Sequence, residues 1–542
     1  MSEPAELRVT DALDKLIHQF SDPLSFYREV IQNALDAGSQ EVEIRITFEP
    51  SGGGDKGLMT VHVDDWGEGM TREIIEKRLT RLFSSSKDGD RTKIGKFGIG
   101  FVSIFATDPE LVCIDTSREG EHWRILFKAD KRFELRRLEV PVDGTKIRIF
   151  KPTTRGEYEA IERRSREVIK YWCKHTRGEV RYQGEVLTEP LGLQDAPIQV
   201  REESDASVLI VGHPSPPCSF FGLYNRGLTL LEGGAVHFSD LAFKISSDHL
   251  EHTLTRDNVI ETEAYHRLLA RLRALIDGDL ARAVFARLGA AIEAGEAPDE
   301  YVYRAAAWHL SLGRPLPREA EDAPVAVAPS GRTIRLAELR RACAQASKGK
   351  EALLRAAARS PVTDALEVRG ESLVVLAPEG APALRLLAGL GLVDPPSVDL
   401  YCVTLPPRDE IETKRWQPLV RATEALLAAQ GSKLAGVAIG HFHYPGSSIA
   451  GRVAITQRRF GDLDRVDEVR ELGASIFSRR RLLVVNADHP TVAALVDLAQ
   501  REPELAAYVL AKLFFLGHRL DADLDGELAR LAVEQRGARR IS

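Results

Sequence analysis

The sequence of 542 residues lacks the features that mark disulfide-rich, zinc-binding, secreted or membrane proteins. Its five cysteines are far apart, without a Cys-x-x-Cys pair or a neighbouring histidine cluster: Cys113, Cys173, Cys218, Cys343 and Cys402. We therefore expect reduced thiols that are buried as small apolar side chains. No apolar run approaches the ~18 residues of a membrane helix, and residues 1–20 are amphipathic and acidic, unlike a signal peptide. These absences predict a cytoplasmic protein without a membrane span.

The chain also lacks a large excess of basic residues and contains few methionines. The 73 basic and 80 acidic residues leave a formal net charge of -7, whereas a dedicated nucleic-acid binder usually carries a basic excess. Nucleic acid is therefore not expected as a partner. With three methionines, the chain lacks the Met-rich apolar surface of adaptable protein-binding sites. The 44% hydrophobic and 28% charged residues are typical of globular domains, and the length allows several of them.

A stripe of polar side chains is present in the run REVIQNALDAGS. Glu29, Asn33 and Asp36 are spaced i, i+4 and i+7, which places two carboxylates and an amide on one face of a helix. The helix is expected to begin after Asp22 and to end with Gly38 as its C′ residue. On its own, such a stripe is most often a solvated helix face.

Two strands are predicted to follow this helix. Residues 41–48 alternate strictly between apolar and polar side chains, as in a half-buried strand. A second strand leads into DDWGEGM, in which Asp65 offers a carboxylate to a donor such as an exocyclic amine. Gly67 and Gly69 let the backbone approach a flat ligand. Alone, this pattern is more often a surface loop.

A polar, small-residue stretch and a glycine-rich run occupy residues 83–105. The first half has the composition of a mobile lid. Gly95, Gly98 and Gly100 then precede an apolar helix, and such an entry exposes backbone N–H groups to a phosphate. Taken alone, three glycines beside a helix are as often a plain tight turn.

These motifs, in this order and followed by DGTKIRIF at 143–150, resemble the GHKL ATPase superfamily of gyrase, heat-shock protein 90, histidine kinases and MutL-type ATPases. The resemblance implies that ATP and Mg²⁺ are the cofactors. It implies that Glu29 is the general base for water, that Asn33 binds Mg²⁺ and that Asp65 accepts the adenine amino group. Further ATP-binding positions implied by it are Asp36, Gly67, Gly69, Met70, Ser86, Lys87, Gly95, Lys96, Phe97, Gly98, Gly100, Phe101 and Thr145.

The remainder of the chain resembles heat-shock protein 90 in its compact bacterial form. LTRDNVI at 254–260 resembles the motif that sends an arginine to the γ-phosphate, which implies a catalytic role for Arg256; an isolated arginine there would more simply be a helix-start residue. Residues 480–519 resemble the family's dimerisation segment: an apolar strand, an Asn-Ala-Asp-His-Pro turn and two helices. Because AAYVLAKLFFL is too apolar for a free helix, either a core or a dimer interface must cover it, and we favour the interface.

The predicted fold class is α/β (α+β), with an N-terminal GHKL (Bergerat) ATPase sandwich, an α/β middle domain and a C-terminal α/β dimerisation domain. The expected domains are residues 1–195, 196–400 (a larger part to about 312 and a smaller αβα part, 315–400) and 401–542.

The predicted function is that of an ATP-dependent molecular chaperone, a homodimer joined through its C-terminal domain that closes on protein clients. A kinase is disfavoured because no phospho-acceptor histidine segment precedes the ATPase domain and because Glu29 stands at the base position. Two alternatives stay open: a dedicated ATPase clamp or switch for one partner, and a MutL-like DNA-processing ATPase. The lid also departs from the family pattern, because RLFSSSKDGD lacks the usual Gly-Thr-Ile-Ala-like run.

Overall fold

The structure is a computed structural model that describes residues 22–80, 99–204, 206–234, 237–251, 259–469, 481–516 and 520–541. The chain divides into two compact units, Met1–Leu280 and Ala281–Ser542. The first unit contains two sheets, and the second contains short sheets interleaved with helices. The α/β fold class is confirmed, whereas the three-domain boundaries stay a prediction.

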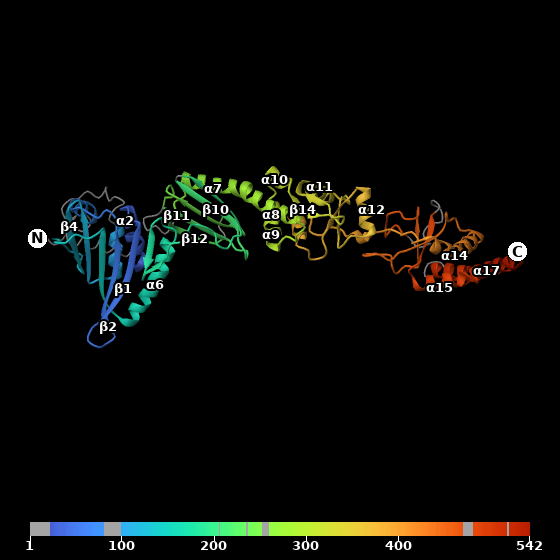
Figure 1. Cartoon of the computed structure of the whole chain (residues 1–542), viewed down its shortest axis with the longest axis horizontal. Coiled ribbons are helices and arrows are strands. Elements are labelled where there is room, and N and C mark those ends of the chain that lie inside the picture. Colours follow the sequence, from blue (N-terminus) through green and yellow to red (C-terminus); the bar gives the residue numbers. More distant parts are fainter. Residues whose placement is uncertain are drawn as a thin grey trace. The chain divides into compact units, whose positions relative to one another are not determined.

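The first unit begins with a large mixed sheet (Figure 1). All pairings in it are antiparallel except that of β1 with β7. Val42, Ile44 and Ile46 are buried, which confirms the predicted half-buried strand. Across the sheet, the order of its eight described strands is β5 (Phe133–Arg137), β4 (Glu121–Lys128), β3 (Leu111–Arg118), β6 (Thr145–Thr154), β2 (Lys56–Asp65), β1 (Glu41–Pro50), β7 (Glu179–Tyr182) and β8 (Glu185–Val186).

Helices α2 (Phe26–Asp36) and α6 (Arg155–Cys173) pack against this sheet and against each other (Figure 1). Asp22 accepts a hydrogen bond from the Leu24 N–H, and Gly38 has φ +81°, so the predicted limits of the first helix are confirmed. A short 3-10 turn, η1, precedes α2 at its start. This turn spans Pro23–Ser25, and the other short helical pieces described in this region are α3 (Arg72–Ile74), η2 (Ile75–Leu79), α5 (Ile99–Val102) and η4 (Ser103–Thr107).

The second sheet of this unit is followed by α7 (Glu263–Leu275) and η5 (Ile276–Leu280). Strands β11 and β13 pair in parallel, and the other neighbours are antiparallel. The β11–β12 hairpin packs on the end of α6, which joins the second sheet to the first. The order of the described strands is β12 (Leu228–Gly233), β11 (Phe220–Asn225), β13 (Ala242–Ser247), β10 (Ser207–His213) and β9 (Ile198–Ser204).

The second unit begins with helices and continues as short strands and helices in alternation. Its elements up to β18 are α8 (Ala281–Glu293), α9 (Glu300–Ser311), α10 (Arg318–Glu321), β14 (Pro324–Val327), β15 (Thr333–Arg335), α11 (Leu336–Ala346), β16 (Leu353–Ala356), α12 (Pro361–Arg369), β17 (Leu373–Leu376), α13 (Leu384–Gly389), η6 (Val398–Leu400) and β18 (Tyr401–Cys402). Strand β14 pairs with β15, and β16 with β17.

The last part of the chain surrounds a three-stranded sheet of order β19-β22-β20. The predicted strand, turn and two helices are present as β22, α15 and α16, and a third helix, α17, follows them. The remaining bounds are α14 (Glu410–Ala429), β19 (Gly436–Gly440), β20 (Ala454–Gln457), β21 (Asp464–Arg465), β22 (Leu482–Asn486), α15 (Pro490–Ala499), α16 (Pro503–Phe515) and α17 (Ala522–Ile541).

Helix α16 is covered within a single chain. It packs against α14, α15 and α17. The buried residues of its apolar side include Ala507, Leu510 and Phe514. The expectation that a dimer interface covers this helix is therefore wrong for these residues, because neighbouring helices of the same chain bury them. A homodimer through the C-terminal domain consequently needs support other than the apolarity of α16.

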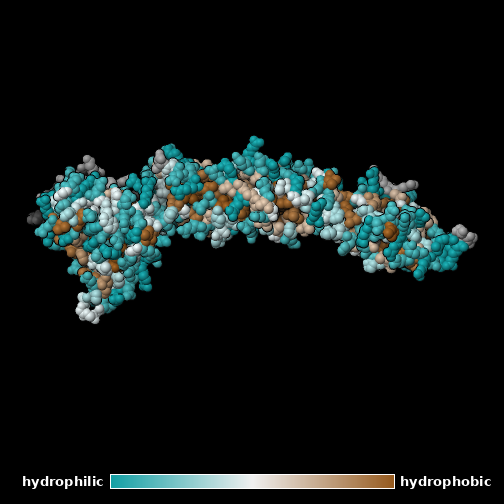
Figure 2. Space-filling view, in the orientation of Figure 1, coloured by the Kyte–Doolittle hydropathy of each residue, from teal (hydrophilic) through white to brown (hydrophobic). Residues whose placement is uncertain are grey.

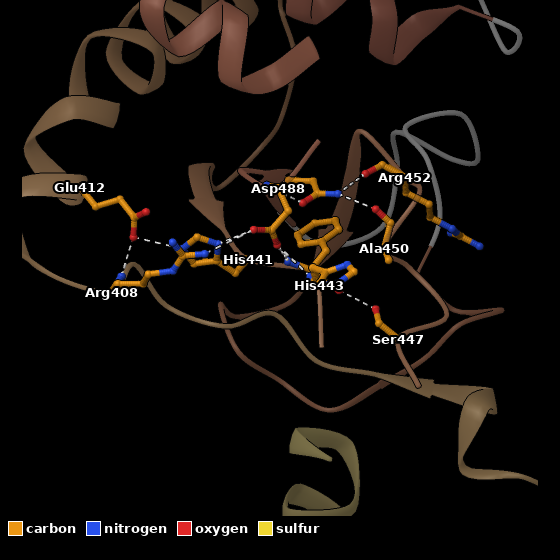
Figure 3. Close-up of polar contacts among 10 residues, drawn as sticks. Arg408, Glu412, His441, His443, Ser447, Ala450, Arg452 and Asp488 are labelled. Atoms are coloured by element: carbon orange, nitrogen blue, oxygen red, sulfur yellow. Dashed lines mark hydrogen bonds and ion pairs between the residues drawn. The ribbon is translucent and has the colours of Figure 1, made fainter. Parts of the chain in front are cut away.

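The Asn-Ala-Asp-His-Pro turn is the centre of a polar network (Figure 3). His441 lies between two carboxylates, with Nδ1 2.7 Å from Asp488 Oδ1 and Nε2 3.0 Å from Glu412 Oε2. The other oxygen of Asp488 accepts from the backbone N–H groups of Phe442 and His443 at 2.7 and 2.8 Å. The network therefore fastens the start of α14 and the end of β19 to the turn before α15.

Figure 2 shows hydrophilic and hydrophobic residues on one face of the described part of the chain. Hydrophilic residues dominate this face, and hydrophobic residues form separated patches. Within the described ranges, no helix is both long and apolar enough to cross a membrane.

Candidate nucleotide site

Asp65 ends strand β2 beside two neighbouring strands. It is paired in register with Thr145 of β6 and with Val42 of β1. Its carboxylate is buried and accepts hydrogen bonds from the backbone N–H groups of Gly67, at 2.9 Å, and Thr145. Burial raises the pKa of Asp65 above the ordinary aspartate value, although the two hydrogen bonds and Lys146 oppose this rise. A buried acceptor at the end of a strand can select a ligand that presents an N–H group.

The glycines after Asp65 are required by close approach of the backbone. Gly69 has φ +69°, and a Cβ there would lie 2.2 Å from the Ser117 carbonyl oxygen. A Cβ on Gly67 would lie 2.9 Å from both Cβ and O of Ala37, the C-cap residue directly after α2. The DDWGEGM loop is therefore held between the C-cap of α2 and strand β3. The sequence predicted close approach of this backbone to a ligand, but not these two contacts.

Two threonine hydroxyls lie next to Asp65. The Oγ1 atoms of Thr116 and Thr145 are 3.2 Å apart, and both residues are buried. Thr116 Oγ1 also accepts from the Met70 N–H at 2.9 Å. Thr145 and Met70 were predicted from the sequence as site residues, whereas Thr116 was not. A single threonine in a strand carries no signal of its own, and only the pairing of β3 with β6 places it here.

Trp66 and Lys146 are two further neighbours of Asp65 that were not predicted from the sequence. Trp66 is 45% exposed, and the Lys146 ammonium lies 4.1 Å from the centre of its ring. Lys146 Nζ also donates to the carbonyl oxygen of Asp65 at 3.4 Å. A positive charge and an exposed aromatic ring thus lie at the edge of the Asp65 site, because Lys146 directly follows Thr145 and Trp66 directly follows Asp65.

The predicted stripe on α2 is divided between buried and exposed residues. Glu29 is buried with 7% exposure, whereas Asn33 and Asp36 are exposed. Glu29 lies directly against Gly100 at the start of α5, since a Cβ built on Gly100 would be 2.0 Å from Glu29 Oε2. Asp36 accepts from Arg226 of the second sheet at 3.2 Å. The structure therefore brings Glu29 to the glycine-rich run, although the two are far apart in sequence.

The Phe101 side chain packs in the core, whereas the sequence predicted a phosphate contact for its backbone. Its side chain is buried and its ring centre is 5.3 Å from that of Phe127, so the ring belongs to the core. Only its backbone remains for the predicted contact with phosphate. The predicted residues that lie outside the described part of the chain are Ser86, Lys87, Gly95, Lys96, Phe97, Gly98 and Arg256.

A cavity of about 310 Å³ in the first unit does not coincide with these residues. Met59, Val61, Ile149 and Lys151 are among its lining residues, and none of the predicted site residues is. Met59 pairs with Lys151 six positions before Asp65 pairs with Thr145, a separation of about 20 Å along a strand. The mostly apolar cavity is thus at the other end of these strands from the candidate site.

The donor set fits a nucleotide with magnesium better than an independent metal centre. Among the described residues, no group of three or more His, Cys, Asp or Glu side chains is arranged to hold a metal ion. Mg²⁺ in nucleotide enzymes is commonly held by one or two protein oxygens together with phosphates and water. The exposed amide of Asn33, one turn from the buried Glu29, is suited to such a partial role.

Comparison with known proteins agrees with this geometry. Residues 27–138 match the family of histidine kinase-, DNA gyrase B- and HSP90-like ATPases. The chain is 28% identical over 232 residues to the chaperone protein HtpG of Methylococcus capsulatus, a match that covers 36% of this chain and 35% of that relative. The match thus spans about a third of the relative's length. Residues 27–138 are thus similar to the ATPase domains of this family, and about a third of the chain is similar to HtpG.

Proposed function

We propose that this chain binds and hydrolyses ATP and uses the hydrolysis to drive a conformational change, as a chaperone of the heat-shock protein 90 type. The observation that supports this most directly is the contact between Glu29 and Gly100. A buried carboxylate is held at the start of the helix that follows the glycine-rich run. This is where a base for an attacking water is needed if the N–H groups of the run hold phosphates.

The described residues divide the work of binding between two ends of the site. Asp65 accepts the adenine amino group, and the hydroxyls of Thr116 and Thr145 offer further polar contacts beside it. Asn33 provides a neutral oxygen ligand for Mg²⁺, which does not add to the negative charge of the phosphates. When bound, Mg²⁺ neutralises charge on the phosphate oxygens. These roles follow the family resemblance and are consistent with the burial and hydrogen bonds of the residues.

Hydrolysis requires a proton acceptor for water. Glu29 takes the proton from the attacking water, and its contact with Gly100 limits the positions that its carboxylate can adopt. Arg256 is proposed to offset the charge that develops on the γ-phosphate, because a guanidinium can bind two phosphate oxygens at once. Its segment lies outside the described residues, so this role rests on the resemblance alone.

The chaperone function rests on similarity to HtpG over part of the chain. We propose protein clients and a homodimer joined through residues 401–542. A clamp that is dedicated to one partner would use the same ATPase site and is the second candidate. The net charge of -7 gives a MutL-like role on DNA no support. Location in the cytoplasm stays a prediction.

The first test compares two glutamate variants of the full chain. Glu29→Gln should bind ATP with nearly unchanged affinity, and its turnover should fall by roughly a hundredfold or more, because an amide cannot accept the proton from water. Glu159→Gln is the matched control: Glu159 is on α6, 54% exposed, and forms an i,i+4 ion pair with Arg155. Binding is measured by calorimetry and turnover by phosphate release. Normal turnover in Glu29→Gln would remove Glu29 as the base.

A capture experiment separates the chaperone from the dedicated clamp. Glu29→Ala is purified from cells in the presence of ATP and Mg²⁺, and the retained proteins are identified by mass spectrometry. Many unrelated proteins support a general chaperone. One stoichiometric protein, or DNA, would replace that proposal with a dedicated clamp.

A further inference from the structure

The turn between β11 and β12 has an arginine at its first central position. Arg226 and Gly227 have φ of +50° and +84°, and they connect the paired residues Asn225 and Leu228. A two-residue turn with both values positive normally has Asn, Asp or Gly first, because other side chains are strained there. Arg226 therefore adopts a strained backbone conformation, as Glu119 and Gln183 do in the turns between β3 and β4 and between β7 and β8.

The backbone of this turn is held firmly against the end of α6. A Cβ on Gly227 would lie 2.0 Å from the carbonyl oxygen of His175. On the adjoining strand, Thr229 Oγ1 donates to the carbonyl oxygen of Tyr171 at 2.5 Å, and Lys174 forms an ion pair with Glu232 at 2.6 Å. Because these contacts fix the turn, Arg226 extends from a rigid base.

The Arg226 side chain lies between carboxylates of two other elements. Its Nη1 is 3.2 Å from Asp36 Oδ1, at the last residue of α2, and its Nε is 3.7 Å from Asp248 Oδ2, directly after β13. The same turn also binds the segment after β13, since Asn225 Nδ2 donates to the carbonyl oxygen of Leu250 at 3.0 Å. One turn thus contacts both the helix of the nucleotide site and the end of β13.

The position of Asp36 connects this contact to the nucleotide site. Asp36 is three residues after Asn33 and seven after Glu29 on the same face of α2. The end of α2 also contacts the Asp65 loop, because the Glu68 N–H donates to the Ala37 carbonyl oxygen at 2.9 Å. A displacement of this end would shift the proposed Mg²⁺ ligand and the adenine loop together.

We propose that Arg226 is a positioning residue of the nucleotide site, which fixes the end of α2 by bridging Asp36 and Asp248. This inference rests on the proposed ATPase function and assigns a role to Asp36. An exposed ion pair by itself stabilises a fold little. Here the arginine acts by holding two carboxylates from separate elements in a fixed arrangement on a rigid turn, as the planar guanidinium allows.

The test measures ATP turnover of full-length variants. Arg226→Ala should lower kcat by roughly three- to tenfold, because the residues of the site remain but the end of α2 that positions them is held less firmly. Arg226→Lys should restore part of kcat, since an ammonium reaches one carboxylate but cannot bridge both. Asp248→Asn should lower kcat in the same direction and add little to Arg226→Ala. Arg267→Ala is the control, because Arg267 is 67% exposed and forms an i,i+4 ion pair with Glu263 of its own helix.

A second measurement does not depend on turnover. Amide hydrogen exchange in residues 33–39 should increase in Arg226→Ala and stay at the wild-type level in Arg267→Ala, with unchanged thermal unfolding in both. Wild-type kcat together with wild-type exchange in Arg226→Ala would overturn the inference. A wild-type chain without ATP turnover would instead remove the proposed function, and the exchange comparison would still decide whether Arg226 orders the end of α2.

Discussion

At the scale of single residues, the candidate nucleotide site depends on glycines, whose lack of a side chain lets other groups come close. Gly67, Gly69 and Gly100 each leave space that a neighbouring group fills, and the neighbours are Ala37, the Ser117 carbonyl group and the Glu29 carboxylate. The glycines were recognisable in the sequence as a pattern. Their contacts were not, because each neighbour is separated from its glycine by at least one intervening element.

The Gly100 contact leads to a prediction about catalysis. Gly100→Ala should lower ATP turnover by roughly tenfold to a hundredfold, because its Cβ would occupy a point 2.0 Å from Glu29 Oε2 and displace the carboxylate. The fold should persist, since the end of a side chain can move away. Gly156→Ala is the control, as a Cβ on Gly156 of α6 meets nothing within 4 Å. Phosphate release measures both variants, and equal turnover would contradict the role of this contact.

At the scale of elements, single hydrogen-bonded groups connect segments that the sequence shows only separately. The Asn-Ala-Asp-His-Pro turn was identified as a connection between a strand and a helix. In the structure its Asp488 also binds His441, and His441 in turn binds Glu412 of α14 (Figure 3). The local pattern was predictable, but its partners were not, because His441 is 47 residues from Asp488 and 29 residues from Glu412.

The Asp488 carboxylate should make the stability of this region depend on pH. Burial acts to raise the pKa of Asp488, but hydrogen bonds from His441 and from two backbone N–H groups outweigh it and hold the pKa below the usual value. The resulting stabilisation is therefore present above the pKa of an unfolded aspartate and is lost as the pH falls through the lower folded value. Asp488→Asn should destabilise the region by about 1–3 kcal/mol at neutral pH and by much less in acid.

The measurement is amide hydrogen exchange in β19 and α15, at neutral pH and at a series of lower pH values that extends well below the pKa of an unfolded aspartate. Asp467→Asn serves as the control, because Asp467 belongs to the same unit and its side chain is 67% exposed. An equal loss of protection at all of these pH values in Asp488→Asn would show that shape, and not the charge of Asp488, stabilises the turn.

At the scale of the whole molecule, the chain forms two units, and the candidate nucleotide site lies in the first. The apolar side of α16 is covered by helices of its own chain. A dimer interface in residues 401–542 therefore has to use side chains that stay exposed. Leu505 on α16 and Val533 on α17 are such residues, with 46% and 70% exposure.

These residues allow a test of the proposed dimer. The wild-type chain should sediment as a dimer, and the double variant Leu505→Glu/Val533→Glu should be a monomer, because unpaired charges disfavour an apolar interface. Val368→Glu is the control: Val368 belongs to the same unit, is 89% exposed and lies outside residues 401–542. A monomeric wild-type chain would contradict dimerisation, and a dimeric double variant would locate the interface elsewhere.

The sequence by itself determined the local parts of this protein: the limits of α2, the alternation of β1, the Asp65 loop and the strand, turn and helices near the C-terminus. Backbone geometry and hydrophobic spacing act over a few residues, so these features can be read from short windows. The tertiary structure alone decided that Thr116 joins the site, that Glu29 meets Gly100, that Arg226 bridges Asp36 and Asp248, and that α16 is covered within its own chain. Contacts between distant segments depend on how strands pair and helices pack, and a local pattern contains no information about its partner.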